Sequence, residues 1–285
     1  MKLGVAAVLV TTVFAGCKAR HAGAAASAYR DEGYVLVWAD EFNKNGAPDS
    51  ANWGYENGFV RNEEDQWYQQ ENAFCKGGLL IIEGRKETKP SPLFAANSPD
   101  WRRRRRQIDY TSSSINTRGK KSWQYGRFVM RGRIDISAGL WPAWWTLGVA
   151  GRWPANGEID IMEYYQKKLL ANIACMGPDK KTEWYSNRFS IDSIGGRNWA
   201  SQFHVWRMDW DENAIALYLD DHLLNKVELT TLVNKDGSGI NPFQQPHYLL
   251  LNLAMGGQNG GDLSGTGFPN RFEVDYVRVY QKRKQ

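Results

Sequence analysis

The stretch GEIDIMEYY, Gly157 to Tyr165, combines three acids with an apolar alternation. Apolar residues alternate with Glu158 and Asp160, which is typical of a β-strand with one apolar face. Glu163 breaks that alternation, because it follows Asp160 by three positions instead of two. We predict that a β-bulge between Asp160 and Glu163 absorbs the extra residue and turns all three carboxylates to one face.

With that bulge, the three acids occupy alternate positions along one face of the strand. The outer Cα atoms then lie about 13 Å apart, and inward-leaning side chains bring the two Glu carboxyl groups to about 5–6 Å. This is close to the spacing of a retaining glycosidase. We therefore predict Glu158 as nucleophile, Glu163 as general acid/base and Asp160 as the assistant of the nucleophile. Mutual repulsion raises the pKa of at least one carboxyl group and keeps a proton available near neutral pH.

Two other interpretations of the three acids remain open at this point. They could form a solvated strand face, although three like charges without lysine partners cost stability. They could also bind calcium, since carboxylates suit a hard cation.

Composition places the chain among proteins with one sizeable core and excludes a nucleic-acid binder. It has 285 residues, of which 42% are apolar, and includes thirteen Trp. The formal net charge is +5, and the run Arg102 to Arg106 alone supplies five positive charges. The rest of the chain is balanced and lacks the broad basic surface that nucleic acid requires. The Arg run is either a solvated loop or a contact for acidic groups of a substrate.

Short apolar or alternating runs recur along the chain between Gly, Asn, Asp and Pro residues. We predict strands at 35–42, 79–85, 113–117, 126–135, 141–148, 157–164, 169–177, 203–210, 214–221, 247–257 and 272–281, with 210–229 forming antiparallel strands joined by tight turns. Many short strands at this spacing indicate an all-β sandwich or barrel. The Pro- and Arg-rich segment 89–107 is predicted to be a long loop that flanks a binding cleft.

The N-terminus predicts export. An apolar run at 4–16 follows Lys2, is too short to span a membrane and fits a signal peptide. Its end, Phe14-Ala15-Gly16-Cys17, is similar to a bacterial lipobox, in which Cys17 is lipidated. An ordinary signal peptide cut later, within 21–28, is the alternative. We predict a signal peptide at 1–17, a tether at 18–32 and a single catalytic domain at 33–285.

Cysteine usage agrees with export but does not define a bridge. If Cys17 carries lipid, Cys75 and Cys175 remain, and they form either a disulfide or two separate buried thiols. No CxxC motif or Cys/His cluster points to zinc.

The motif Glu-Ile-Asp-Ile-Met-Glu, 158–163, resembles the signature of glycoside hydrolase family 16 in its bulged, laminarinase and β-glucanase-like form. Other segments resemble that family in the same order: 37–42, 125–134, 139–148, 204–210, 249–257 and 272–281. The resemblance covers about residues 34 to 281. It implies a β-jelly-roll of two antiparallel sheets with a concave substrate cleft, and retaining endo-cleavage of β-linked glycans.

The resemblance also implies residues around the three acids. Trp141 and Trp145 share strand parity and are expected in the cleft, where flat indoles suit sugar rings, while Trp144 points to the core. Further substrate-binding residues implied by the resemblance are Arg118, Asn62, Glu63, Trp184 and Gln258. No cofactor is required, although a structural calcium near Glu41 and Asp275 is allowed.

The chain departs from the β-1,3-glucan enzymes of the family at three places. The strand after the catalytic one, 169–177, carries no His, and the four His of the chain lie elsewhere: His21, His204, His222 and His247. The family's Asn-Glu-Leu-Gln loop has become 62–67, Asn-Glu-Glu-Asp-Gln-Trp, and the Arg run is an addition. These differences affect the expected substrate, not the reaction.

The sequence therefore predicts an exported, lipid-anchored monomer that cleaves internal β-1,3 or mixed β-1,3/1,4 linkages of a polysaccharide. The alternative within the same chemistry is an endo-β-1,4-galactosidase acting on poly-N-acetyllactosamine of mucin-type O-glycans or on algal galactans. The alternative of another class is a non-catalytic glycan-binding protein, against which the three intact acids argue.

Overall fold

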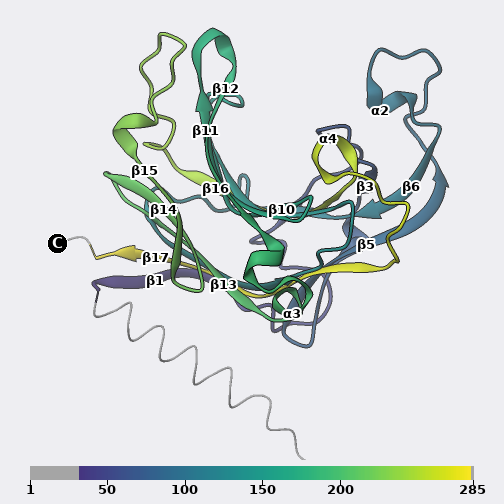
Figure 1. The fold of residues 1–285 in the computed structure, drawn as a ribbon, viewed down its shortest axis with the longest axis horizontal. Helices are drawn as coiled ribbons and strands as arrows, with labels where there is room; N and C mark the ends of the chain where they lie inside the picture. The colour runs from purple at the N-terminus through teal and green to yellow at the C-terminus, as the bar shows by residue number, and fades with distance from the viewer. Residues whose placement is uncertain (1–31, 284–285) are drawn as a thin grey trace, which may run out of the picture.

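The computed structural model describes residues 32–283, which form two stacked β-sheets (Figure 1). The predicted signal peptide and Cys17 lie outside the described residues. Within them, no helix is both long enough and apolar enough to cross a membrane.

The convex sheet has ten strands within the described residues. Its order is β15 (His222–Glu228), β14 (Ala214–Leu219), β13 (His204–Trp210), β8 (Gly126–Ile134), β17 (Asn270–Lys282), β5 (Leu79–Pro90), β6 (Gln107–Ser112) and β3 (Gln66–Tyr68). Two further strands join it from the side, β1 (Tyr34–Asp40) on β17 and β4 (Ala73–Lys76) on β5. All its pairs are antiparallel except β3 with β6.

The concave sheet has seven strands within the described residues, all paired antiparallel. Its order is β12 (Thr182–Ser190), β11 (Lys168–Met176), β10 (Glu158–Tyr165), β9 (Leu140–Gly148), β16 (His247–Met255), β7 (Ser114–Asn116) and β2 (Gly54–Tyr55). The motif strand β10 therefore lies near the middle of this sheet. The prediction of an all-β sandwich of two sheets is confirmed.

The helices between 32 and 283 are short. They are α2 (Trp101–Arg104), α3 (Gly196–Ala200), α4 (Gly257–Gly260) and the 3-10 turns η1 (Gln70–Asn72), η2 (Pro178–Lys180), η3 (Ile191–Ile194) and η4 (Leu229–Thr231). They connect strands, and a few of their residues join the core (Ile191 of η3 and Leu229 of η4) or the cleft (Gln258 and Asn259 of α4).

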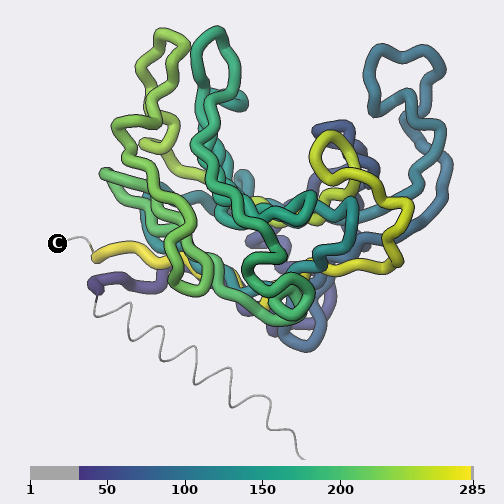
Figure 2. The backbone as a smooth tube through the Cα atoms, viewed as in Figure 1, coloured from purple at the N-terminus to yellow at the C-terminus, as the bar shows by residue number. Residues whose placement is uncertain are grey.

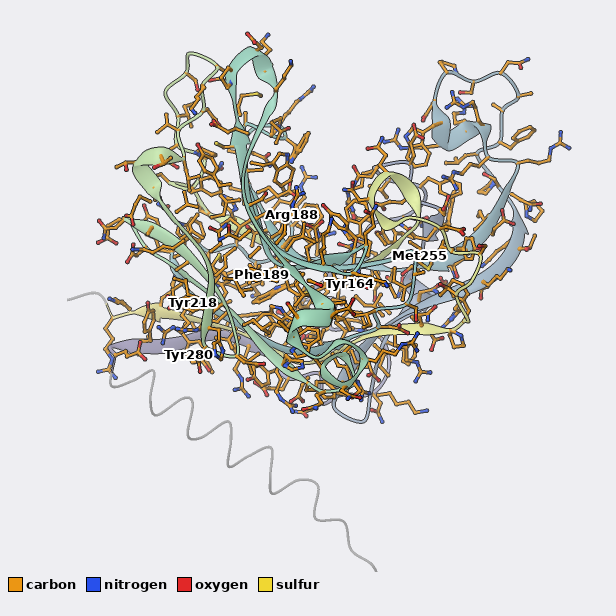
Figure 3. The ribbon with its side chains drawn as sticks, viewed as in Figure 1. Tyr164, Arg188, Phe189, Tyr218, Met255 and Tyr280 are labelled. Carbon is orange, nitrogen blue, oxygen red and sulfur yellow. The ribbon has the colours of Figure 1, made fainter. Side chains whose placement is uncertain are left out.

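Strand alternation sends one face of the concave sheet into the core and leaves the other for the cleft. On β9, Trp144 is fully buried in the core, whereas Trp141 and Trp145 lie on the opposite face, as predicted. The same alternation separates neighbours on β12, where Phe189 packs against the core and Arg188 lies on the cleft side (Figure 3).

The predicted β-bulge is present in β10. The pairing with β11 shifts register between Asp160 and Glu163. Towards β9 the shift falls between Asp160 and Met162, with Met162 opposite Trp144. Ile161 and Met162 are both buried in the core, so two consecutive side chains point inward and Glu163 returns to the face of Asp160.

Two walls rise on opposite sides of β10 (Figures 1 and 2). One is the β11–β12 hairpin. The other is a long arm made by β5, β6 and the connection between them, which carries α2 near its tip. The predicted loop 89–107 is therefore the outer part of this arm.

The two described cysteines are separate buried thiols. Cys75 lies in β4 and Cys175 in β11, and both are free. Burial raises the pKa of Cys75 to about 12 and that of Cys175 to about 11, so neither thiol is ionised near neutral pH.

Candidate active site

The register of the concave sheet aligns its cleft-facing residues in rows that cross five strands. Three such rows contain the three acids: Asn252–Ala143–Glu163–Leu170–Arg188, Leu250–Trp145–Asp160–Asn172–Ser186 and Tyr248–Leu147–Glu158–Ala174–Trp184. The bulge is what returns Glu163 to a cleft-facing row. Glu158, Asp160 and Glu163 therefore sit on three consecutive rows of one face.

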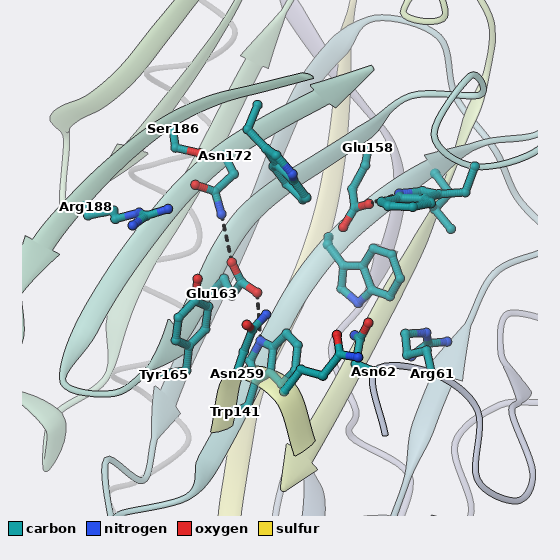
Figure 4. Close-up of a pocket in the computed structure, with 15 residues that line it drawn as sticks. Arg61, Asn62, Trp141, Glu158, Glu163, Tyr165, Asn172, Ser186, Arg188 and Asn259 are labelled. Carbon is teal, nitrogen blue, oxygen red and sulfur yellow. Dashed lines mark hydrogen bonds between the residues drawn. The ribbon is translucent and has the colours of Figure 1, made fainter. Parts of the chain in front are cut away.

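A cavity of about 610 Å³ covers these rows (Figure 4). Its lining combines two of the acids, aromatic rings, amides and two guanidinium groups: Arg61, Asn62, Trp141, Trp145, Leu147, Trp153, Glu158, Glu163, Tyr165, Asn172, Trp184, Ser186, Arg188, Gln258 and Asn259. A smaller cavity of about 50 Å³ also contacts Asp160. A cavity that combines aromatic rings with convergent carboxylates is the expected form of a catalytic site.

Glu163 is a buried acid with a pKa raised to near neutrality. Its side chain is 8% exposed and accepts a hydrogen bond from Trp141 Nε1 at 2.7 Å and one from Asn172 Nδ2 at 2.8 Å (Figure 4). Burial raises the pKa of Glu163 to about 7, with repulsion from Glu158 in the same direction, although the two N–H donors oppose this. A carboxyl group with this pKa can donate a proton and take it back near neutral pH.

Asp160 lies between the two Glu residues and is 3% exposed. Burial and the charges of Glu158 and Glu163 raise its pKa well above the usual range. Its carboxyl group hydrogen-bonds Glu158 and accepts a hydrogen bond from Asn172 Nδ2 at 3.2 Å. A protonated Asp160 would thus donate to Glu158 and favour the ionised form of that carboxylate.

Glu158 is held in place by partners that favour its charged form and partly offset a rise in its pKa caused by burial. Burial raises its pKa, but the indole N–H of Trp153, the Asp160 carboxyl and the positive charge of Arg61 all lower it. Trp153 is 52% exposed and hydrogen-bonds Glu158 Oε2 from the rim of the cavity. The arrangement places a carboxyl group whose partners favour ionisation at one end and one with a pKa of about 7 at the other, which suits covalent glycoside cleavage.

Most of the sequence-predicted binding residues line the large cavity. Trp141, Trp145, Asn62, Trp184 and Gln258 all contribute to it. Trp145 is held by its indole N–H, which donates to Asn252 Oδ1 at 2.7 Å, and the guanidinium of Arg61 lies 5.2 Å from its ring centroid.

Two predicted residues lie outside both cavities. Glu63 is exposed and lines neither cavity, so its contact with a sugar stays a prediction. The next residue, Glu64, is 2% exposed, lines the small cavity and accepts hydrogen bonds from Asn62 and Gln66. Arg118 is also exposed, with its guanidinium 5.8 Å from the ring of Tyr248.

The sequence reasoning missed Asn172, Arg188 and Arg61 as lining residues. Asn172 had a readable signal, because it is a lone polar side chain in the apolar run of β11 and shares strand parity with no core residue. Arg188 lies on β12, an edge strand with no clear alternation of exposure. Its guanidinium makes no hydrogen bond or ion pair with any of residues 32–283.

The expected calcium ligands do not fit a metal ion. Both carboxylate oxygens of Glu41 accept hydrogen bonds from Arg278, at 2.6 and 2.8 Å. Asp275 forms an ion pair with Arg131 at 2.8 Å. Arginine therefore neutralises both acids, and the part of the chain from 32 to 283 contains no group of three or more His, Cys, Asp or Glu that could hold a metal.

Comparison with known proteins gives a consistent family assignment. The model of the family "Glycosyl hydrolases family 16" matches residues 62–278. A β-glucanase of Rhodothermus marinus is 36% identical over 265 residues, covering 87% of this chain and 85% of that protein. Two further relatives are longer proteins, of which the chain spans 38% and 34%.

Two solved structures share the fold over most of the chain. One comes from work on endo-acting O-glycanases that members of the human gut microbiota express to initiate mucin breakdown. It is 33% identical with a TM-score of 0.79, covering 88% of this chain and 92% of that one. The other is the laminarinase catalytic domain of Thermotoga maritima, which is 30% identical with a TM-score of 0.71, covering 88% of this chain and 99% of that one.

Proposed function

The chain belongs to glycosyl hydrolase family 16, and on that premise we propose that it hydrolyses internal β-1,3 or mixed β-1,3/1,4 linkages of a β-glucan with retention. The observation that carries the proposal is the bulged strand β10, which brings Glu158, Asp160 and Glu163 to one face under the cavity. The glucanase relatives support the substrate class.

In the first step, Glu158 attacks the anomeric carbon and forms a glycosyl ester. Glu163 donates its proton to the glycosidic oxygen, and the leaving sugar departs with a new hydroxyl group. The pKa of Glu163, about 7, keeps this proton available at neutral pH. Asp160 supports the reaction by its hydrogen bond to Glu158.

In the second step, Glu163 acts as a base. The ionised carboxylate removes a proton from water, the water oxygen attacks the anomeric carbon and Glu158 is released as a carboxylate. The N–H groups of Trp141 and Asn172 stabilise the charge that Glu163 carries between the steps. Asn172 thus acts as a positioning residue, because its amide joins the assistant and the acid/base.

The test of this proposal is cleavage of defined polysaccharides. Laminarin and barley β-glucan should release reducing ends in the presence of the wild-type protein, and Glu158→Gln should bind the same glycans without turnover. Turnover retained in Glu158→Gln would refute the assignment of the nucleophile. Binding without release by the wild-type protein would instead favour the glycan-binding alternative.

A second substrate is favoured by two observations. The structure from the work on O-glycanases has the higher of the two TM-scores. The guanidinium of Arg188 lines the cavity in the row of Glu163 and has no hydrogen-bond or ion-pair partner among residues 32–283. A guanidinium of this kind suits sulfate or sialate. The second candidate is therefore endo-β-1,4-galactosidase activity on poly-N-acetyllactosamine of mucin-type O-glycans. Release of oligosaccharides from mucin or keratan glycans, but not from laminarin, would select it.

We also propose that the protein is exported and held on a membrane by lipid on Cys17, and that it acts as a monomer. The sequence Phe14-Ala15-Gly16-Cys17 supports the lipid anchor. Cys17→Ala should move the protein from the membrane fraction to the soluble fraction, and an unchanged distribution would refute the anchor.

A further inference from the structure

The loop at residues 59–65, here called the cleft loop, carries Arg61 and Asn62 into the large cavity. On its inner side it is fixed by backbone hydrogen bonds, from Asp65 N to Met255 O at 2.8 Å and from Gln258 N to Asn62 O at 2.9 Å. Its outer side faces the arm formed by β5, β6 and their connection. The Arg run 102–106 lies at this contact.

Arg102 hydrogen-bonds the start of the cleft loop. Its Nε donates to Phe59 O at 3.1 Å, and its Nη2 donates to Val60 O at 2.6 Å. Its own position is fixed by Asp100, whose carboxylate accepts from the backbone N–H of Arg102 at 3.0 Å and from Nη1 at 3.2 Å.

Arg105 hydrogen-bonds the end of the same loop. Its Nη1 donates to Asp65 Oδ1 at 2.9 Å, and its Nη2 donates to Glu63 O at 2.7 Å. The guanidinium also lies 4.9 Å from the ring centroid of Phe59 and 5.4 Å from that of Trp101. A forked donor is required for this double contact, because a lysine ammonium is a single point charge.

Between the hydrogen bonds of Arg102 and those of Arg105, the backbone of the cleft loop is strained. Asn62 has a φ of +54° and Glu63 a φ of +51°, in the left-handed region that side chains other than Gly rarely adopt. Such conformations persist only where the surroundings hold them. Arg102 holds the carbonyl group of Val60, which precedes the strained pair, and Arg105 holds the carbonyl group of Glu63, the second residue of the pair.

We propose that Arg102 and Arg105 are positioning residues, which lock the cleft loop in the strained form that presents Arg61 and Asn62 to the substrate. The proposal rests on the proposed function for its effect on catalysis, but the locking itself does not depend on which glycan binds. The sequence left the Arg run as either a solvated loop or a contact for acidic groups of a substrate, whereas Arg102 and Arg105 contact the cleft loop of the protein itself.

The other members of the run provide the matched control. Arg103 and Arg104 are exposed and make no hydrogen bond or ion pair with the cleft loop among residues 32–283. Arg103→Ala therefore removes the same side chain and the same charge as Arg105→Ala, only two positions away, without touching the loop.

The first measurement is hydrogen–deuterium exchange of the full chain without substrate. Arg105→Ala should speed exchange in peptides covering 59–65 by about tenfold, since opening of the loop is then easier. Arg105→Lys should give a smaller increase, and Arg103→Ala should match the wild-type protein. Unchanged exchange in both Arg105 variants would overturn the proposal.

The second measurement separates binding from chemistry with the polysaccharide that the wild-type protein cleaves. Arg105→Ala should raise KM about tenfold and lower kcat much less, because the hydrogen bonds of Glu158 to Trp153 and of Glu163 to Trp141 and Asn172 do not involve the cleft loop. Equal losses in Arg103→Ala and Arg105→Ala would show a general charge effect and overturn the proposal. If the wild-type protein cleaves no glycan but the exchange difference is present, the proposed function fails and the locking of the loop stands.

Discussion

Replacement of Asn172 by Ala tests the active-site chemistry most directly. The Asn172 amide uses both N–H groups on carboxylates, one on Glu163 Oε2 at 2.8 Å and one on Asp160 Oδ2 at 3.2 Å. The residue is 4% exposed, so water does not readily replace these bonds. Asn172→Ala leaves all three acids in place and removes only the shared donor.

The size and sign of the effect follow from Glu163. In the wild-type protein the pKa of Glu163 is raised to about 7, and kcat/KM should fall as the pH rises through this value, because the acid loses its proton. A hydrogen bond to a charged group contributes about 1.5–3 kcal/mol, and it stabilises the ionised form here. Its loss should therefore shift the fall of kcat/KM at high pH, here called the basic limb, to higher pH by roughly 1–2 units. Turnover at the optimum should fall about 10- to 100-fold, because the carboxyl group is less well oriented.

The assay is the pH dependence of kcat/KM on the polysaccharide that the wild-type protein cleaves. Asn225→Ala is the matched control, because the Asn225 amide is also buried and donates to Ala171 O and Tyr185 O, away from the acids. Asn225→Ala should lower the free energy of unfolding and leave the pH dependence of kcat/KM unchanged. A basic limb that stays in place or moves downward in Asn172→Ala would refute the assignment of Glu163 as the acid.

Three further predictions concern single side chains. Trp141→Phe keeps the ring but removes the second N–H donor to Glu163, so the basic limb of kcat/KM should again move to higher pH; an unchanged limb would contradict this. Trp144→Ala should lower the free energy of unfolding by about 3–5 kcal/mol, whereas Trp145→Ala, on the cleft face, should cost less stability and mainly raise KM; denaturant titration and kinetics distinguish the two. Burial lowers the pKa of His247 from 6.5 to about 4, so the unfolded chain takes up a proton first as the pH falls, and stability should decrease by roughly 3 kcal/mol between these values. His247→Gln should flatten that part of the pH–stability curve, and an unaltered slope would contradict the assignment.

The face on which each side chain of β9 and β10 lies was predictable, because it follows from the alternation of the strand and from the position where that alternation breaks. The misfit of Glu163 in an otherwise regular strand required a bulge, and the parity of Trp141, Trp144 and Trp145 required one core indole between two cleft indoles. Both features are local, and the structure has both. The number of short strands and the turns between them indicated a sandwich or a barrel, and the family resemblance implied the sandwich.

Other features depend on contacts that the sequence does not encode locally. Asn172 and Glu163 meet across two strands, and Arg105 reaches Asp65 from a distant arm. Strand β12 was missed because an edge strand on an exposed wall buries neither face fully. In the cleft loop, the sequence places two acids side by side, and only the packed loop shows that Glu64 is buried while Glu63 is exposed.

The bulge in β10 also bears on how this strand can change length. Ile161 and Met162 both point into the core where a regular strand would place one side chain, so deletion of either leaves the order Glu, any residue, Asp, any residue, Glu. In an unbulged strand those three acids again fall on alternate positions of one face. The cost of such a deletion falls on the core, as a cavity left by one apolar side chain, and not on the orientation of the acids. Deletion of Ile161 or Met162 therefore shortens the strand and still leaves the three acids on one face. Deletion of Ile159 or Asp160 would instead misplace or remove one of the acids.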